Sequence, residues 1–196
     1  MKHFLGIAVF MNEAINSGEL SLEAQVYGWK DVAACRKSTS EGYSTVVMPG
    51  AFFYFDMRQT QREHGHDWAG IFDARKTLSF DFEEQGFTPE EMKRVVGVQG
   101  AFWSEAYISH RDTEYNYLEY QVYPRICALS ELAWSGDGGE WSEFYERLTQ
   151  SHYSRMVAMG IDFRLFPPTV SHADGLLTAK TDDKSHIYYK IVGSDE

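Results

Sequence analysis

The sequence predicts an α/β fold built around a parallel β-sheet. Four short apolar segments, at residues 4–10, 24–29, 43–48 and 94–103, recur along the 196-residue chain. Segments with helical patterning separate them, and apolar strands that alternate with helices are typical of a parallel sheet covered by helices. The length suits one domain, or one domain with a small appendage, and is sufficient to bury a sizeable core.

The first strand is predicted at residues 4–10. Its surroundings imitate a secretory signal peptide, because Lys2 precedes an apolar run from Phe4 to Met11. That run is short, is followed by Asn12-Glu13 and lacks a cleavage site of small residues. A buried parallel strand is therefore the favoured interpretation. No run approaches the ~20 apolar residues that a membrane-spanning helix needs, and the sequence gives no address for a cellular compartment.

Short helices are predicted between the strands. Residues 30–42 follow the second strand with helical composition, and Gly42 is suited to end that helix. A second short helix is predicted at 88–94, just before the fourth strand. Thr88 is suited to cap it and Pro89 to occupy its first position, with two acidic residues completing the first turn.

Two longer helices are predicted in the second half of the chain. The stretch Leu118–Trp134 has helical patterning, with Pro124 tolerable near a helix start or at a kink. A last helix is predicted to end at Gly160. Its core-facing stripe is expected to comprise residues that recur at helical spacing, namely Trp141, Tyr145, Leu148, His152, Met156 and Met159.

The character of the chain changes at Pro167-Pro168, which predicts a stiff hinge. The following stretch, 175–196, has the pattern of two short strands around a polar turn. Two strands do not form an independent domain. The sequence therefore predicts a main unit at 1–166 and a short β segment at 167–196.

Composition excludes several classes of function. The formal net charge of −11 and the absence of a basic run argue against a nucleic-acid partner. Cys35 and Cys127 are far apart, so they are interpreted as small buried hydrophobes rather than a metal or disulfide framework. His64, His66 and Asp67 could supply metal ligands, but one short polar cluster favours a solvated loop. No phosphate loop or nucleophilic triad is recognisable, and neither metal nor cofactor is expected.

Aromatic rings and carboxylates gather where the predicted strands end. Trp29, Tyr54 with Asp56, and Trp103 with Glu105 all lie at or just beyond carboxyl ends of strands, where parallel folds bind ligands. Alternation along a strand places Trp103 and Glu105 on the same face. Ring faces can cover the C–H face of a pyranose while carboxylates accept hydrogen bonds from its hydroxyls. Taken singly, each residue is better explained by core packing, for the tryptophans, or by a solvated cap, for the carboxylates. Three strand ends with the same chemistry favour a sugar site.

The same segments resemble the family 20 glycoside hydrolases, the β-N-acetylhexosaminidases. VVGVQGAFWSEAYIS and the EYNYLEYQVYPRICALSELAWS that soon follows are similar to the family's last barrel strand and its next helix. GYSTVVMPGAFFYFDM and DWAGIFDARKTLSFDF are similar to the preceding strand and its loop, and AQVYGW to the strand before them. FMNEAI falls where the family usually has W-[DNQ]-E. These segments stand in family order over roughly residues 5 to 166.

The resemblance implies the C-terminal half of a TIM (β/α)8 barrel, strands five to eight, over residues 1–166. Residues 167–196 are then a linker and the truncated start of a C-terminal β-sandwich. The implied ligand is an N-acetylhexosamine-containing glycan with terminal β-linked GlcNAc or GalNAc. The implied partner is a second copy of the chain or the missing N-terminal half-barrel.

The resemblance also implies roles for six residues. Trp29 and Trp103 wall the pocket for the 2-acetamido group, and Tyr54 donates a hydrogen bond to the acetamide carbonyl oxygen. Asp56 and Glu105 hold sugar hydroxyls, and Trp68 stacks nearer the leaving group.

The sequence departs from the family pattern in two places. Met11 stands where the family has a tryptophan, which thins one wall of the acetamide pocket. The catalytic Asp-Glu pair of an H-x-G-x-D-E motif is absent, since the HGHD segment at 64–67 lacks the following glutamate. The family reaction is substrate-assisted, and its proton comes from that missing glutamate. The isolated chain is therefore predicted to be inactive.

Two other interpretations stay open at this point. One is a non-catalytic sugar-binding or assembly module, a half-barrel that keeps part of the site without its chemistry. The other is an unrelated half-barrel α/β enzyme whose motifs match by chance.

Overall fold

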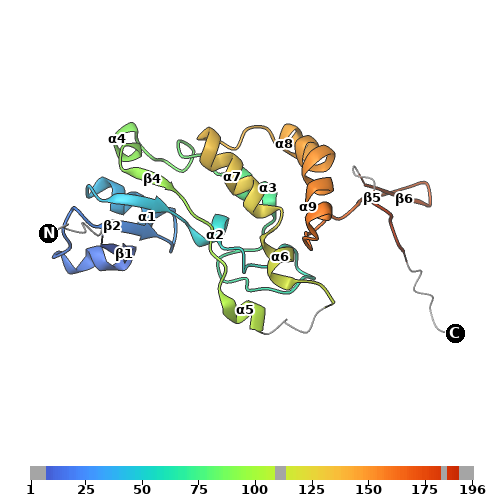
Figure 1. Cartoon of the computed structure of the whole chain (residues 1–196). Helices are drawn as coiled ribbons and strands as arrows, with labels where there is room; N and C mark the ends of the chain where they lie inside the picture. Colours follow the sequence, from blue (N-terminus) through green and yellow to red (C-terminus); the bar gives the residue numbers. More distant parts are fainter. Residues whose placement is uncertain (1–7, 109–113, 182–184, 190–196) are drawn as a thin grey trace.

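The computed structural model describes residues 8–108, 114–181 and 185–189. Its centre is a four-stranded parallel sheet in the order β1–β2–β3–β4 (Figure 1). The strands are β1 (Val9–Met11), β2 (Gln25–Gly28), β3 (Ser44–Val47) and β4 (Val95–Val98). This arrangement confirms the predicted alternation of strands and helices, although residues 4–7 of the first predicted strand lie outside the described part.

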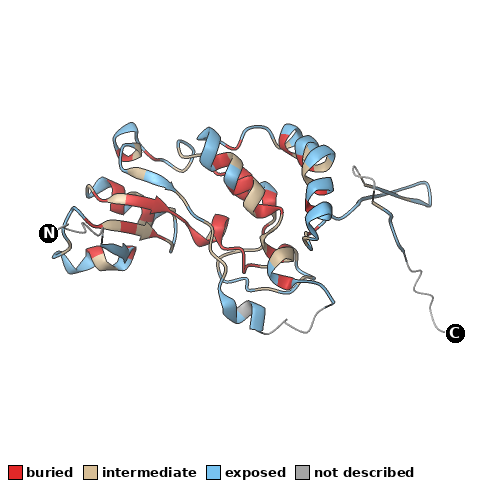
Figure 2. Ribbon diagram, viewed as in Figure 1, coloured by how far each residue is buried: buried red, intermediate tan, exposed pale blue. Residues whose placement is uncertain are grey.

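The two inner strands are buried and the two outer ones are open. Val26 and Val47 are fully buried, whereas Val9 and Val96, on the outer strands, are 53% and 54% exposed. In the described part of the chain, β1 pairs only with β2 and β4 only with β3. Figure 2 shows this contrast as red inner strands beside paler edges. The described residues form no closed barrel.

The first two predicted short helices are confirmed. Helix α1 (Val32–Ser40) begins where the Asp31 side chain accepts a hydrogen bond from the backbone N–H of Ala34, and it packs against β2 and β3. Helix α4 (Pro89–Met92) has a complete capping box, because Thr88 and Glu91 each bond the other's backbone N–H. Both helices are therefore specified locally.

Two further short helices lie between β3 and α4 along the chain. They are α2 (Gly50–Phe53) and α3 (Ala74–Leu78). The Thr77 hydroxyl donates to the carbonyl oxygen of Phe52 at 2.8 Å, which joins these helices in the interior. The long connection between them, residues 54–73, carries several of the residues that the sequence places in the site.

The helix predicted at Leu118–Trp134 is two helices. They are α6 (Tyr117–Val122) and α7 (Arg125–Ser135), separated at Tyr123 and Pro124. Pro124 has no backbone N–H and cannot continue the hydrogen-bond ladder, so the chain re-starts there. Helix α7 then packs along α3 and lies next to β4.

The last predicted helix is continuous in space but changes its winding. It comprises α8 (Trp141–Arg147), a π-helical turn η2 (Leu148–His152) and α9 (Tyr153–Met159). The wider turn shifts the helical period, so Tyr153 faces the core while Met159 is 71% exposed. The expectation that Met159 belongs to the core stripe is therefore wrong.

The short β segment is present, and β6 (Leu176–Lys180) confirms the first of the two strands predicted within 175–196. Its partner is not a later strand but β5 (Thr169–Ala173), which pairs antiparallel with it around Asp174-Gly175, both at positive φ. Asp-Gly is a favoured two-residue hairpin turn. Residues 185–189 form no strand, and 190–196 lie outside the described residues. Figure 2 shows the hairpin as exposed along most of its length.

The core lies between the sheet and the helices around it. Its largest cluster joins β3, the aromatic residues around α2 and α3, and the inner face of α7: Cys35, Val47, Phe52, Phe53, Phe55, Phe80, Phe87, Leu129 and Leu132. Cys35 is fully buried and Cys127 partly buried, and both are free thiols. Burial raises the pKa of the Cys35 thiol to about 12, consistent with a packing role. None of the helices that the structure describes has both the length and the apolar composition to cross a bilayer.

Candidate functional site

A pocket of about 620 Å³ lies at the carboxyl ends of the four parallel strands. We call it the strand-end pocket. It contains all six residues that the sequence places in the site, together with three more; its lining is Met11, Glu13, Trp29, Tyr54, Asp56, His66, Trp68, Trp103 and Glu105. In parallel α/β folds this end of the sheet carries the ligand, because the connecting loops there are free to vary.

Trp29 reaches the pocket because β2 ends at Gly28. Its backbone N–H donates to the Asn12 side chain at 3.2 Å, and its carbonyl oxygen accepts from Gly50 at 2.8 Å. Its indole Nε1–H donates to Oε2 of Glu13 at 3.1 Å. The residue is thus held on both sides of its backbone and at the ring.

Tyr54 and Trp103 are brought together by an isolated bridge between Tyr54 and Ala101. Here the chain after β4 runs beside the chain after α2, and Ala101 donates to Phe53 while Phe55 donates to Ala101. The expected strand to residue 103 therefore stops at Val98, but the extended chain still delivers Trp103 to the pocket.

Glu105 lies on a helix and not on a strand. Helix α5 (Ser104–Ile108) begins immediately after Trp103, so Glu105 is in its first turn. The expectation that strand alternation puts Trp103 and Glu105 on one face is therefore wrong. Both still line the pocket, and both are exposed, Trp103 by 44%.

Four aromatic rings form one contiguous wall. The rings of Trp29 and Tyr54 are stacked, with centroids 6.3 Å apart and planes inclined by 17°. Trp68 meets these two rings edge-on at 6.1 and 5.7 Å, and Trp103 lies 6.1 Å from Tyr54. Tyr54 is buried, whereas Trp68 is 55% exposed. The wall therefore runs from a closed floor to an open rim.

The Tyr54 phenol is a hydrogen-bond donor at neutral pH. Burial raises the pKa of Tyr54 to about 12, and the charges of Asp56 and Glu13 act in the same direction. A side-chain hydrogen bond with Trp103 opposes them without reversing the shift. The hydroxyl is therefore protonated and able to donate to a ligand carbonyl.

Asp56 is a buried carboxylate with spare hydrogen-bonding capacity. The residue is 1% exposed, and its Oδ1 has no hydrogen-bond partner. Burial raises the pKa of Asp56, although its own backbone N–H, His66 and Arg125 act in the opposite direction. An unpartnered buried acceptor is costly, so an oxygen of this kind beside a pocket suits a ligand that brings a hydroxyl donor.

His66 is placed by a tight turn in the connection 54–73. Its N–H donates to the carbonyl oxygen of Asp56 at 2.9 Å, and its own carbonyl accepts from Arg58 at 2.8 Å. Gly65 has φ +135°, and a Cβ there would lie 2.6 Å from the backbone nitrogen of Arg58. Only glycine fits this approach, which brings His66 and Trp68 back over the pocket.

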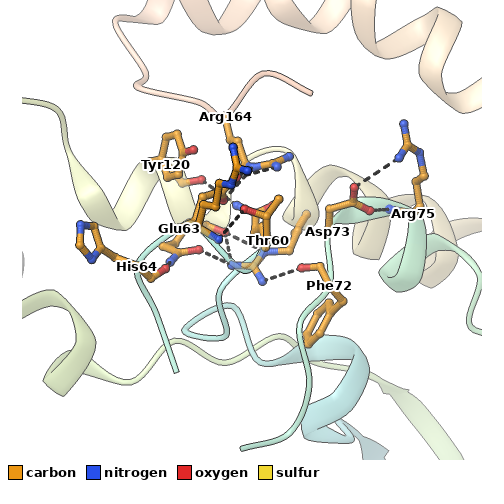
Figure 3. A network of polar contacts seen from close by, with 12 residues as sticks. Thr60, Glu63, His64, Phe72, Asp73, Arg75, Tyr120 and Arg164 are labelled. Atoms are coloured by element: carbon orange, nitrogen blue, oxygen red, sulfur yellow. Dashed lines mark hydrogen bonds and ion pairs between the residues drawn. The ribbon is translucent and has the colours of Figure 1, made fainter. Parts of the chain in front are cut away.

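Ion pairs and hydrogen bonds anchor this connection from outside the pocket. Arg164, which is 2% exposed, donates to both carboxylate oxygens of Glu63 at 2.8 to 3.1 Å (Figure 3). Burial alone would lower the pKa of Arg164, but the Glu63 carboxylate outweighs it and raises that pKa. Gln121 donates to the carbonyl oxygen of His64 at 2.8 Å. The loop is therefore tied to α6 and to the segment after α9.

Arg125 supports the floor of the pocket. Its fully buried guanidinium donates to the carbonyl oxygens of Phe55, Met57 and Phe72, with the Met57 contact at 2.9 Å. Burial lowers the pKa of Arg125 to about 9, so the side chain remains charged at neutral pH. Its charge and donors fix the backbone on both sides of Asp56.

Two lining residues were not assigned to the pocket from the sequence. Glu13 belonged to a matched segment without a role, and His66 was considered only as a metal ligand. Met11 was expected at a wall of the pocket in place of a tryptophan, and it does line the pocket. Within 8–108, 114–181 and 185–189, no group of three or more His, Cys, Asp or Glu side chains is placed to hold a metal ion. Asp67 instead forms an ion pair with Arg58.

The chain matches the model of the glycosyl hydrolase family 20 catalytic domain over residues 7–137. Among characterised relatives, a β-hexosaminidase of Vibrio furnissii is 29% identical over 123 residues, which are 60% of this chain and 19% of that protein. An N,N'-diacetylchitobiase of Vibrio harveyi is 27% identical over 192 residues, with coverages of 76% and 21%. The chain thus spans about a fifth of the length of these two relatives.

Solved structures share the fold. A family 20 exo-β-N-acetylglucosaminidase of Vibrio harveyi in complex with N-acetylglucosamine superimposes with a TM-score of 0.69 at 24% identity, covering 80% of this chain and 24% of that one. A β-N-acetylhexosaminidase of Streptomyces coelicolor gives a TM-score of 0.67 at 23% identity, with coverages of 81% and 32%. These similarities show an α/β fold of the TIM-barrel type.

Proposed function

Because the chain belongs to glycosyl hydrolase family 20, we propose that it forms the sugar-holding part of a β-N-acetylhexosaminidase. Its ligand is a terminal, β-linked N-acetylhexosamine, GlcNAc or GalNAc. The observation that carries the proposal is the strand-end pocket, which four aromatic rings line together with the buried Asp56 and its unpartnered oxygen. Family membership also excludes the interpretation of the chain as an unrelated α/β enzyme.

Six of the nine lining residues have a role that their environment supports. Trp29 and Trp103 wall the space for the 2-acetamido group, and the protonated Tyr54 hydroxyl donates to the acetamide carbonyl oxygen. Asp56 and Glu105 accept hydrogen bonds from ring hydroxyls. The exposed Trp68 at the rim stacks on the sugar next to the leaving group.

The chemistry proposed for the whole enzyme is substrate-assisted hydrolysis with retention. The acetamide oxygen attacks C1, the glycosidic oxygen leaves with a proton from a general acid, and water then opens the oxazoline. In the described part of the chain, the carboxylates that line the pocket are Glu13, Asp56 and Glu105. None belongs to an adjacent Asp-Glu pair, so we propose that this chain alone binds sugar without hydrolysing it.

The open sheet supports a proposal about partners. Within the part of the chain that the structure describes, the outer edges of β1 and β4 are unpaired, and Val9, Phe10 and Val96 on them are exposed. Unpaired edges with apolar side chains favour association. We propose that residues 1–166 are strands five to eight of the barrel and that the edges pair with the N-terminal half-barrel or a second copy. Residues 167–196 are then a linker and the start of a β-sandwich, of which the exposed hairpin β5–β6 is the first part.

A non-catalytic sugar-binding or assembly module is the second candidate. The observation that favours it is the same lack of an Asp-Glu pair among the pocket-lining residues. The two candidates differ in what precedes the chain in its gene. An in-frame H-x-G-x-D-E motif upstream of Met1 supports the enzyme, and a stop codon there supports the module.

The deciding experiment measures binding and turnover on the same 196-residue chain. N-acetylglucosamine binding is followed by ligand-observed NMR, and turnover by release of p-nitrophenol from its β-N-acetylglucosaminide. We expect binding that Glu105→Ala weakens, with Glu19→Ala as the control for loss of an exposed carboxylate outside the pocket. Absence of binding overturns the sugar site. Turnover that Glu105→Ala abolishes overturns the proposed inactivity and points to an acid supplied within this chain or across a dimer.

A further inference from the structure

Two consecutive residues after β1 hold Trp29 at different points. Asn12 Oδ1 accepts the backbone N–H of Trp29 at 3.2 Å, and Glu13 Oε2 accepts its indole Nε1–H at 3.1 Å. Asn12 is buried, whereas Glu13 is exposed on the pocket side. One residue therefore fixes where the tryptophan leaves the sheet, and the next fixes how its ring is turned.

The register of the sheet produces this pairing. Strands β1 and β2 run parallel with Met11 opposite Tyr27, and the chain enters the 3-10 helix η1 directly after Met11. The first two residues of η1 therefore lie at the carboxyl end of β1, beside the residue that follows β2. From there Asn12 reaches the backbone N–H of Trp29, and Glu13 reaches its indole nitrogen.

Apart from this hydrogen bond, packing holds the indole ring. Trp29 is half-buried against a core cluster that contains Met48, Tyr54, Met57 and Phe72. Its aromatic contacts in the described residues are the stacked Tyr54 and the edge of Trp68, itself 55% exposed. Met11, which lines the same pocket, is 45% exposed and has a flexible side chain. A tryptophan at a pocket wall with one side open needs a directional bond to keep its face in one orientation, and a carboxylate acceptor gives a strong one.

We propose that Asn12 and Glu13 form a clamp that positions Trp29 as a wall of the sugar pocket, with Glu13 as the orienting residue. This proposal rests on the proposed function, since the wall matters only if the pocket holds the N-acetyl group. Glu13 is a positioning residue and acts through the ring. Its charge has a second effect in the same direction, because it favours the protonated, donating form of Tyr54.

The test uses Glu13→Ala and Glu13→Gln in the 196-residue chain. Glutamine keeps an oxygen acceptor at the same reach, whereas alanine removes it. Glu19→Ala is the matched control, because it removes an exposed carboxylate just beyond the same 3-10 helix η1 (Asn12–Ser17) and away from the pocket. Glu13 is exposed, so loss of its side chain leaves the folded core intact.

The first readout is the indole N–H resonance of Trp29 in a ¹H–¹⁵N spectrum. The chain has five tryptophans, and Trp29→Phe assigns the signal. We expect Glu13→Ala to move this resonance toward that of a solvated indole and to speed its hydrogen exchange, while Glu13→Gln and Glu19→Ala leave it near the wild-type position. A Trp29 resonance that does not respond to Glu13→Ala overturns the clamp.

The second readout is affinity for N-acetylglucosamine relative to glucose. The net free energy of one hydrogen bond corresponds to roughly a two- to tenfold change in Kd. We expect Glu13→Ala to weaken the binding of N-acetylglucosamine by about that factor, and Glu13→Gln to keep the wild-type affinity. A general loss of structure would weaken the binding of both sugars by the same factor. If the resonance moves and the affinity ratio stays constant, the positioning role is overturned. If the wild-type chain binds neither sugar, the proposed function fails, and the resonance alone decides whether Glu13 holds the ring.

Discussion

Asp56→Asn is expected to make the protein more stable and a weaker sugar binder. Oδ1 of Asp56 is buried without a hydrogen-bond partner, and burial raises the pKa of the carboxyl group. The ionised form is therefore disfavoured in the folded chain. Asparagine has the same shape, keeps an oxygen for the backbone N–H that Asp56 accepts, and places an uncharged group at the orphan position.

The magnitude follows from the charge of the unpartnered group, because a buried charged group without a partner costs more than the roughly 1–3 kcal/mol of a neutral one. An amide at this position stays unpartnered but is uncharged, and we expect this change to be worth about 1–2 kcal/mol in the free energy of unfolding at pH 7. For a chain of this length that raises Tm by roughly 2–8 °C. The affinity for N-acetylglucosamine should move the other way, falling about tenfold or more, because a charged acceptor contributes roughly 1.5 kcal/mol or more to a hydrogen bond.

The effect on stability should depend on pH in one direction. The folded pKa of Asp56 lies above its unfolded value, so the wild-type chain carries the full penalty at pH values above the folded pKa. The penalty fades as the pH falls through the folded pKa and is gone below the unfolded pKa of about 3.9. The stability advantage of Asp56→Asn should therefore be largest near pH 7 and vanish below about pH 4.

The assay is thermal unfolding of both proteins at pH 7 and at acidic pH, with sugar affinity measured at pH 7. Asp174→Asn is the control, since it makes the same charge change at an exposed turn position outside the pocket and Asn-Gly is an equally favoured hairpin turn. The reasoning is refuted if Asp56→Asn lowers Tm at pH 7, or if its advantage is the same at both pH values.

Two further predictions concern the floor and the edges. Arg125→Lys should lower the free energy of unfolding by roughly 2–6 kcal/mol, because a lysine cannot reach the carbonyl oxygens of Phe55, Met57 and Phe72 together and each oxygen left without a donor costs about 1–3 kcal/mol. A urea midpoint that changes by less than the equivalent of about 0.5 kcal/mol contradicts this prediction. The chain should also self-associate in sedimentation velocity, and Val96→Lys should shift it toward monomer because a charged side chain protects an exposed β4 edge; a wild-type monomer at all concentrations argues against this surface.

The sequence predicted the parts of the fold that depend on local chemistry. Thr88 caps the start of α4 as expected, and Glu91 completes the capping box. The break before Arg125 also has a local cause, since Pro124 was expected at a helix start or a kink. The π-helical turn before Tyr153 depends on how a long helix fits the core, which no local pattern records. The hairpin at Asp174-Gly175 was predictable from its turn residues, although both strands were expected after this turn.

The residues of the pocket were easier to predict than the way they arrive there. Glu105 was placed on a strand, yet it reaches the same pocket from the first turn of α5. The spacing of a motif can therefore predict which side chains line a pocket, even when the backbone between them adopts a different secondary structure from the one expected. His66 shows the opposite limit, because its place depends on the Gly65 turn and on a bridge to Met57 that no spacing indicates.

The three carboxylates that line the strand-end pocket in the described residues are suited to different tasks, and none of them belongs to an adjacent Asp-Glu pair. Glu13 accepts a hydrogen bond from the Trp29 indole. Asp56 is buried at the floor, where its unpartnered oxygen can accept from a ligand hydroxyl. Glu105 lies at the exposed start of α5. Under the proposed function, recognition of the sugar and protonation of the leaving group are divided between different parts of the barrel. Binding without turnover by this chain is the result that this division predicts, because the general acid then comes from another segment.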